Sequence, residues 1–293
     1  MIQEKKTKSG RLLEVDLYPV WKNGTRIPSR APKHKRTSAE QERYNRAQAI
    51  KKLIRLVNAN FDTGDILMHP TYRPEKAPLS EDKARRDIRN YISRVKYKRA
   101  SELTRVTKLL KENPNSKRLL DKKKQLEKPF KYVYVIEKQT YKTGKLAGRD
   151  NYHFHIFLTG GLNRDMLEDM WGADMRVNAD RFQPEKFGPE SAARYMSKDP
   201  QGNKRFCHSQ NCEKPKEKKS GVPIMSHRSL SKVAQERVDD ADYWQRKHKG
   251  YKFLRCYSRF NAYNGHWYVS VIMYKTNSKE ELPQWNIEDW IGD

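Results

Sequence analysis

The sequence predicts an α+β fold in which helices flank an antiparallel sheet, with extensions at both ends of the chain. Residues 131–137 are rich in β-branched and aromatic side chains, which is typical of a strand. A loop with Gly144 and Gly148 separates them from a second strand at residues 152–158, so we expect the two strands to pair as a hairpin. Helical periodicities lie before and after this hairpin, and they supply the flanking helices.

Residues 1–60 are predicted to form an N-terminal basic arm and a helix. A strand is indicated near the start by four apolar positions, Leu12, Leu13, Val15 and Leu17. The basic, proline-containing residues 26–36 are interpreted as an arm or linker. Thr37 or Ser38 can cap a helix, with Glu40 and Gln41 as capping-box partners. The helix is predicted from a single apolar face formed by Ile50, Leu53, Ile54 and Val57.

Residues 61–200 are predicted to form the main domain. They start with a short strand within residues 61–72, which Pro70 either restricts to a sheet edge or ends early. Ser80 is expected to begin a helix, and the interruption at residues 113–115 indicates a helical hairpin. Beyond the strand hairpin we expect a helix at 163–171, a strand at 175–182 and a helix at 189–197.

Residues 201–293 are predicted to form a C-terminal extension. Residues 201–222 are polar and rich in lysine, which indicates a mobile segment or surface loop at a domain edge. A helix at 230–247, strands at 251–257 and 266–274, and an acidic tail are expected to follow.

The charge of the chain points to nucleic acid as a partner. There are 62 Lys and Arg residues against 36 Asp and Glu residues, a net charge of +26. No apolar run approaches the roughly 18 residues of a membrane span, and the N-terminus lacks the apolar centre of a signal peptide. Three cysteines without an export signal favour reduced thiols. We therefore expect a cytoplasmic protein that does not bind membranes.

His153 and His155 are the first candidates for chemistry. Side chains alternate along a strand, so both imidazoles project from the same face and can share one divalent ion. The predicted hairpin brings the carboxylate of Glu137, at the end of the neighbouring strand, toward them. One carboxylate and two imidazoles suit Mn²⁺ or Mg²⁺ better than a closed structural zinc site. The alternative is a solvated or hydrogen-bonded histidine pair beside an exposed charge at the strand end.

Tyr195 and Lys198 form a second candidate pair. A spacing of three residues places both side chains on one face of the predicted helix. A free phenol is a poor nucleophile at neutral pH, so a metal-bound phosphate and the ammonium of Lys198 would be needed to favour its phenolate. The alternative is a half-buried tyrosine beside a solvated lysine.

The order of these motifs resembles the HUH endonucleases, in particular the rolling-circle replication initiators of filamentous phages and small plasmids. Residues 61–72 resemble the first motif of that family, His153 to His155 the second, and Tyr195 to Lys198 the third. The resemblance extends over roughly residues 37–215. It implies an RRM-like or ferredoxin-like nuclease core. The single tyrosine departs from phage enzymes with two, which puts a two-tyrosine scheme in doubt.

The resemblance implies a metal-dependent DNA-nicking transesterase. Tyr195 would join the 5′ phosphate of single-stranded DNA at a replication origin, and the freed 3′ hydroxyl would prime a host polymerase aided by a host helicase. His153, His155 and Glu137 would hold the metal. Lys198 would assist catalysis, and Arg194, Lys204 and Arg205 would contact the DNA. The implied setting is the cytoplasm of a bacterial host.

Two other functions stay open. A transposase with a single tyrosine would use the same chemistry on the ends of a mobile element. A non-catalytic basic module would instead present tyrosine and phenylalanine to RNA or DNA.

Two further motifs are weighed against simpler interpretations. His69 could approach nucleic acid, but a lone histidine more often has no chemical role. Cys207, His208 and Cys212 could suggest zinc, yet three potential ligands at this spacing do not make a structural site.

Overall fold

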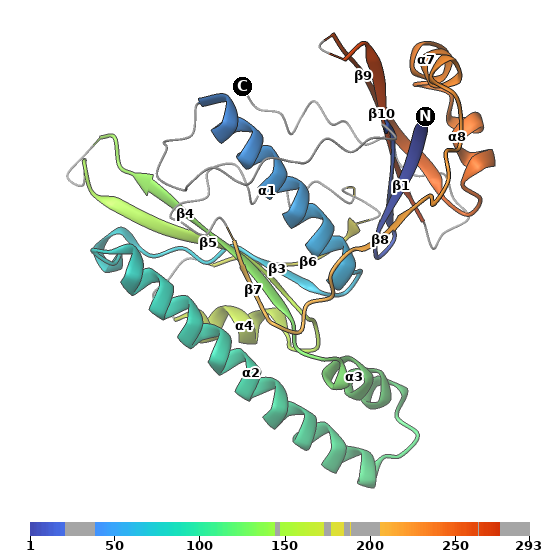
Figure 1. The fold of residues 1–293 in the computed structure, drawn as a ribbon. Coiled ribbons are helices and arrows are strands. Elements are labelled where there is room, and N and C mark those ends of the chain that lie inside the picture. Colours follow the sequence, from blue (N-terminus) through green and yellow to red (C-terminus); the bar gives the residue numbers. More distant parts are fainter. Residues whose placement is uncertain are drawn as a thin grey trace. The chain divides into compact units, whose positions relative to one another are not determined.

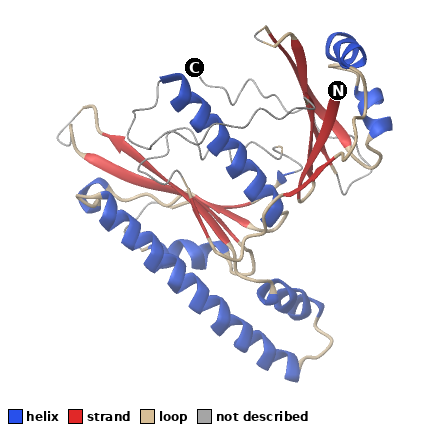
Figure 2. Ribbon diagram, viewed as in Figure 1, coloured by secondary structure: helices blue, strands red, loops and turns tan. Residues whose placement is uncertain are grey.

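The computed structural model describes residues 1–20, 39–143, 147–172, 177–184, 188, 206–262 and 264–275. These residues form two compact units. The central unit contains residues 60–212, and the terminal unit contains residues 1–59 and 213–275. Each unit holds one antiparallel five-stranded sheet together with helices, which confirms the predicted α+β class (Figures 1 and 2). The division falls after residues 59 and 212, whereas the sequence predicts boundaries after 60 and 200.

The sheet of the central unit has the order β6-β3-β5-β4-β7. Its strands are β3 (Ile66–Met68), β4 (Tyr132–Thr140), β5 (Asp150–Leu158), β6 (Ala179–Arg181) and β7 (Cys207–His208). The predicted hairpin is confirmed, because β4 and β5 pair antiparallel with Tyr132 opposite Leu158 and Thr140 opposite Asp150. Side chains alternate along both strands and therefore project from two opposite faces of the sheet.

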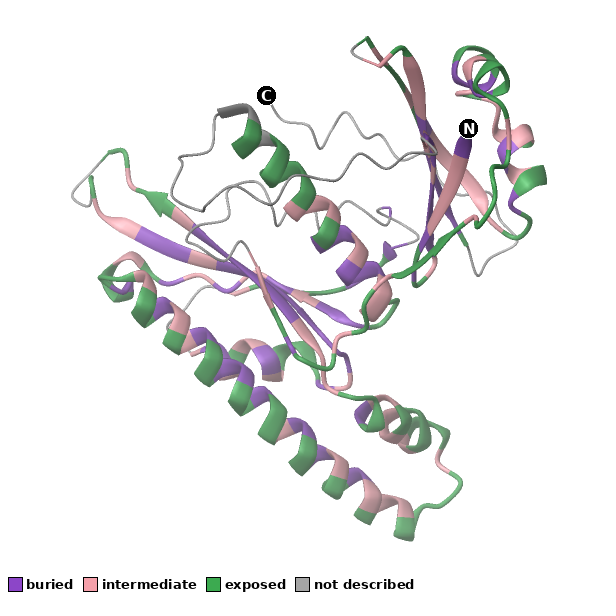
Figure 3. Cartoon of the chain, in the orientation of Figure 1, coloured by how far each residue is buried: buried purple, intermediate pink, exposed green. Residues whose placement is uncertain are grey.

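One face of this sheet is apolar and packs against helices. The helices of the unit are α2 (Glu81–Glu112), α3 (Lys117–Glu127) and α4 (Arg164–Trp171), with the 3₁₀ turn η1 (Pro74–Lys76) before α2. Figure 1 shows α2 and α4 on the same side of the sheet, where Tyr91 and Trp171 join Phe154 in the core. The side of α2 turned toward the sheet is buried and its opposite side is exposed (Figure 3).

The sequence signals for α2 and α3 are confirmed. Ser80 caps α2, since its hydroxyl accepts a hydrogen bond from the backbone N–H of Lys83 at 3.3 Å. The helix ends at Glu112, and α3 starts after the predicted break to complete a helical hairpin.

The buried guanidinium of Arg99 holds this helical hairpin to the end of β5. Its N–H groups donate to five backbone carbonyls, those of Gln125, Leu126, Lys128, Thr159 and Gly160. Among the described residues, no carboxylate lies within hydrogen-bond distance of Arg99. The dipoles of the carbonyl groups therefore balance its charge. Burial lowers the pKa of Arg99, although the charge of Asp65 opposes this effect.

The sheet of the terminal unit has the order β8-β1-β2-β10-β9. Its strands are β1 (Ile2–Ser9), β2 (Leu12–Pro19), β8 (Lys216–Lys219), β9 (Lys252–Asn261) and β10 (His266–Tyr274). Helices α7 (His227–Glu236) and α8 (Ala241–Lys247) cover one face, where Leu230 and Trp244 meet Val15 and Val269. Strands from the N-terminal and the C-terminal parts of the described residues therefore contribute to one sheet.

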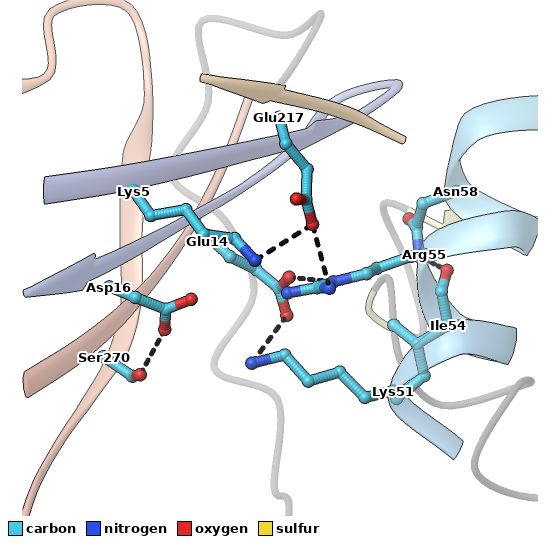
Figure 4. A network of polar contacts seen from close by, with 9 residues as sticks. All are labelled: Lys5, Glu14, Asp16, Lys51, Ile54, Arg55, Asn58, Glu217 and Ser270. Atoms are coloured by element: carbon cyan, nitrogen blue, oxygen red, sulfur yellow. Dashed lines mark hydrogen bonds and ion pairs between the residues drawn. The ribbon is translucent and has the colours of Figure 1, made fainter. Parts of the chain in front are cut away.

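Helix α1 (Ala39–Asn60) is joined to this sheet by ion pairs (Figure 4). Arg55 bonds to the buried carboxylate of Glu14 on β2, and Lys51 lies 3.8 Å from the same group. Arg55 also lies 3.8 Å from Glu217 on β8, which pairs with Lys5 at 3.0 Å. Burial raises the pKa of Glu14 more strongly than the two cations lower it. The contact therefore fixes the position of α1 more than it stabilises the fold.

One of the two alternatives for Pro70 is confirmed, because strand β3 ends early at Met68, whereas its place between β5 and β6 excludes the edge position. Two other predictions about individual elements are wrong. The described part of residues 201–222 carries β7 and β8 in place of a mobile loop. The helix predicted at 230–247 is two helices, because the side chain of Asp240 caps the second by accepting the N–H of Tyr243.

Some predicted elements lie outside the described residues, namely the basic arm at 26–36, the caps at Thr37 and Ser38, the helix at 189–197 and the acidic tail. The strand predicted at 175–182 lies partly outside them, and its described part contains β6. Within the described residues, no helix combines the length and the apolar character that crossing a bilayer requires.

We predict that Arg99→Ala lowers the free energy of unfolding by about 3 kcal/mol or more, because buried carbonyls lose their donor. Urea denaturation followed by circular dichroism measures the change. Lys96→Ala, at an exposed position on the same helix, is the matched control and should alter stability by less than about 0.5 kcal/mol. Equal effects of the two variants would contradict the structural role of Arg99.

Candidate metal centre

The pairing of β4 with β5 brings three potential metal ligands together. Glu137 lies directly opposite His153 in the antiparallel register. His155 is two residues further along β5, so its side chain projects from the same face. Phe154 projects from the opposite face into the apolar core. The alternation that anchors Phe154 in the core therefore directs both imidazoles to the other face of the sheet.

The ligand atoms of the three side chains converge on one point. The Nε2 atom of His153 lies 2.7 Å from Oε2 of Glu137, and Nε2 of His155 lies 3.3 Å from the same oxygen. The two Nε2 atoms are 3.1 Å apart. Within the described residues, this is the one group of three or more such side chains whose ligand atoms lie close enough to hold a metal ion.

The environment of Glu137 favours an ionised carboxylate. Burial raises its pKa, but hydrogen bonds from His153 and His155 and their charges outweigh this effect and bring the pKa to about 2. Its second oxygen, Oε1, is buried and has no hydrogen-bond partner among the described residues. A buried anion with an unsatisfied oxygen is costly unless a cation compensates it. The donor set thus fits a divalent ion.

The interpretation of Glu137 as a residue at a strand end is wrong. Strand β4 continues to Thr140, so Glu137 lies inside the ladder and is 9% exposed. Its position in the ladder, and not a free end, is what directs the carboxylate at the histidines.

His69 is a member of the site that the sequence did not identify. Its Nδ1 atom lies 2.8 Å from Nδ1 of His155. After β3 ends, the chain continues beside β5, where the carbonyl of Pro70 accepts the N–H of Phe154 and Thr71 bridges to His153. Proline has a backbone carbonyl that can accept a hydrogen bond but no N–H that must donate one. The His-Pro-Thr sequence therefore fits this path beside β5.

The contact with His69 determines which nitrogen of His155 faces the other ligands. If Nε2 of His155 offers its lone pair to a metal, its proton lies on Nδ1 and is donated to His69. His69 must then be neutral and carry its own proton on Nε2. Burial supports this state, since it contributes most to lowering the pKa of His69 to about 4.

The ligand set belongs to an open metal site. One carboxylate and two imidazoles can hold a divalent ion and leave coordination positions for water or another ligand. The cysteines do not offer a competing site among the described residues: the thiol of Cys212 contacts Ser209 at 3.2 Å, and the Nδ1 atom of His208 lies 2.9 Å from the Ser209 carbonyl.

The other predicted site residues lie outside the described part of the chain. These are the proposed nucleophile and its neighbour, Tyr195 and Lys198, and the expected DNA contacts Arg194, Lys204 and Arg205. Their roles stay predictions. Comparisons with protein-family models, with curated proteins and with solved structures found no match to this chain.

We predict that Mn²⁺ stabilises the wild-type protein against unfolding. At a concentration a hundredfold above its Kd, the ion should add about 2.7 kcal/mol to the free energy of unfolding, because it binds only the folded site. Differential scanning fluorimetry detects this as a rise in Tm. His153→Ala should abolish the rise, and His208→Ala, outside the cluster, should retain it. A rise that survives in His153→Ala would place the ion elsewhere.

We also predict that His69→Ala weakens Mn²⁺ binding about 10- to 100-fold, because His155 loses the acceptor that orients its ring. Isothermal titration calorimetry provides the affinity. His69→Gln should recover much of it, since an amide oxygen can accept the Nδ1 proton. Unchanged affinity in His69→Ala would show that the contact with His155 does not orient the ligand.

Proposed function

We propose that the protein is a metal-dependent endonuclease and ligase that nicks one DNA strand through a phosphotyrosine intermediate and so initiates rolling-circle replication. The convergence of Glu137, His153 and His155 on one point carries this proposal. The same three residues are those that the resemblance to HUH endonucleases implies as metal ligands.

The described residues have distinct roles in this proposal. His153, His155 and Glu137 hold the ion, and His69 fixes the ring of His155 through their 2.8 Å contact. When bound, the metal ion supplies Lewis-acid polarisation of a non-bridging phosphate oxygen. The buried apolar face behind the ligands keeps them in position, because Phe154 packs against Tyr72 and Trp171.

Tyr195 is the proposed nucleophile. Its phenolic oxygen forms a bond to the phosphorus of a phosphodiester while the bond from phosphorus to the 3′ oxygen breaks. The phenolic proton is lost, and the 3′ oxygen leaves as a hydroxyl after gaining a proton. The ammonium of Lys198 lowers the free energy of the phenolate and of the charged phosphate. Reversal of the same step rejoins the strand without an external energy source.

The charge of the chain supports a nucleic acid as the substrate. A net charge of +26 favours binding to phosphates and release of their counterions. Single-stranded DNA at a replication origin is the proposed substrate, and the freed 3′ hydroxyl would serve a host polymerase with a host helicase. The bacterial cytoplasm is the proposed location.

The direct test is the formation of a covalent adduct. The protein should be incubated with Mn²⁺ and labelled single-stranded DNA from its own replicon and then analysed under denaturing conditions. We predict a denaturant-resistant adduct that peptide mapping assigns to Tyr195. Tyr195→Phe should form none and should bind the DNA with unchanged affinity, because the ring and the charged surface remain.

Tyr44→Phe is the control, because Tyr44 is an exposed tyrosine on α1 and its variant should form the adduct normally. No adduct in the wild-type protein, at DNA concentrations that saturate binding, would favour a non-catalytic nucleic-acid-binding module. An adduct at another tyrosine would remove Tyr195 from the proposed role.

A further inference from the structure

The C-terminal part of the terminal unit has an unusual composition. Residues 243–275 contain seven lysines and arginines and no aspartate or glutamate. Ten of these 33 residues are aromatic, whereas aromatic residues make up 11% of the whole chain. Burial of Trp244 and Tyr274 in the terminal unit accounts for only part of this aromatic content. The remainder belongs largely to β9 and β10.

The register of β9 and β10 separates their side chains into two faces. Cys256 on β9 and Val269 and Val271 on β10 point toward α7 and α8 and form the core. Arg255, Tyr257 and Arg259 alternate with the core positions, so they lie on the opposite face. Tyr268 lies opposite Arg259 and joins them. We call Arg255, Tyr257, Arg259 and Tyr268 the β9 face.

The β9 face lies at the side of the sheet and is partly accessible, since Arg255 and Tyr268 are half-buried. Strand β9 is the last strand in the sheet order, so it has a strand neighbour only on its β10 side among the described residues. Tyr257 is 51% exposed, and Arg259 is also exposed. The exposed ring of Tyr257 offers an apolar surface on which a base can stack.

Arginines and tyrosines of this face already contact one another. The guanidinium of Arg255 lies over the ring of Tyr257, 5.2 Å from its centroid, and that of Arg259 lies 5.9 Å from the centroid of Tyr268. Such pairs hold both side chains in place and keep the positive charge next to a flat apolar surface. Bases that stack on the rings would therefore place their phosphates near a guanidinium.

The acidic side chains on this face of the sheet lie on β2 and β8 and are engaged there. Glu14 bonds to Arg55, Asp16 accepts a hydrogen bond from Ser270, and Glu217 pairs with Lys5 (Figure 4). In the sheet order, strand β10 lies between β9 and all three of these carboxylates. The β9 face is therefore complementary to a polyanion and presents no carboxylate of its own.

We propose that the β9 face binds single-stranded DNA, with bases stacked on Tyr257 and Tyr268 and with phosphates bound by Arg255 and Arg259. A single strand fits better than a duplex, because the bases of a duplex already stack on each other and leave no ring surface for tyrosine. The choice of DNA over RNA rests on the proposed function. The binding surface itself rests on the composition and geometry of β9 and β10.

Fluorescence anisotropy with a labelled oligothymidine in EDTA tests this surface without cleavage. Tyr257→Ala should weaken binding about tenfold or more, and Tyr257→Phe should restore it, because the ring provides the stacking. Arg259→Gln should lower the slope of log affinity against log salt by about 0.7. Tyr97→Ala is the matched control, because Tyr97 is 79% exposed on basic helix α2 and its loss should leave affinity unchanged.

Wild-type affinity in Tyr257→Ala, or an equal loss in Tyr97→Ala, would overturn the proposal. Tighter binding to duplex DNA or to oligouridine of the same length would overturn the choice of single-stranded DNA. The outcome is separable from that of the proposed function. Binding that depends on Tyr257 in a protein that forms no adduct supports the surface alone, and an adduct in a protein insensitive to Tyr257→Ala supports the nuclease alone.

Discussion

The register between β4 and β5 is the constraint on which the candidate site depends. It places Glu137 opposite His153 and leaves His155 on the same face. A shift of one residue would turn both imidazoles into the core and bring Phe154 out of it. The core resists this shift, because Phe154 is fully buried against Tyr72 and Trp171. Apolar packing on one face therefore fixes the ligand geometry on the other.

The site also carries an electrostatic cost that a metal ion would relieve. A carboxylate and three imidazoles lie close together at positions that are buried or partly buried, and the Oε1 atom of Glu137 has no partner among the described residues. A purely structural cluster would gain little from this arrangement, because apolar side chains of similar size could fill the same space at lower cost. A cation that accepts lone pairs from Glu137, His153 and His155 would compensate this cost.

Much of the fold could be predicted where the signal is local. The β4–β5 hairpin, the Ser80 cap and the break between α2 and α3 each depend on a few neighbouring residues, and all are confirmed. Strands β1 and β8 were not predicted, because their lysines hide any apolar alternation. Strand β1 forms a local hairpin with β2, in which Ser9 lies opposite Leu12. Strand β8 depends on a partner more than 200 residues away, as the pairing of Lys5 with Lys219 shows.

The candidate site shows the same limit. The convergence of Glu137, His153 and His155 could be predicted, because one hairpin brings them together. His69 could not, because its place depends on how the chain runs beside β5 after β3 has ended. The one local signal is the Pro-Thr sequence that follows His69. It can be interpreted only once the strand order β3-β5-β4 is known.

The most direct measurement is anomalous diffraction at the manganese edge from crystals of the full chain grown with Mn²⁺. The account predicts one strong peak at ligand distance from Nε2 of His153, Nε2 of His155 and a carboxylate oxygen of Glu137, with His69 on the far nitrogen of His155. Crystals that show no peak there at saturating Mn²⁺, or a peak at other residues, would contradict it.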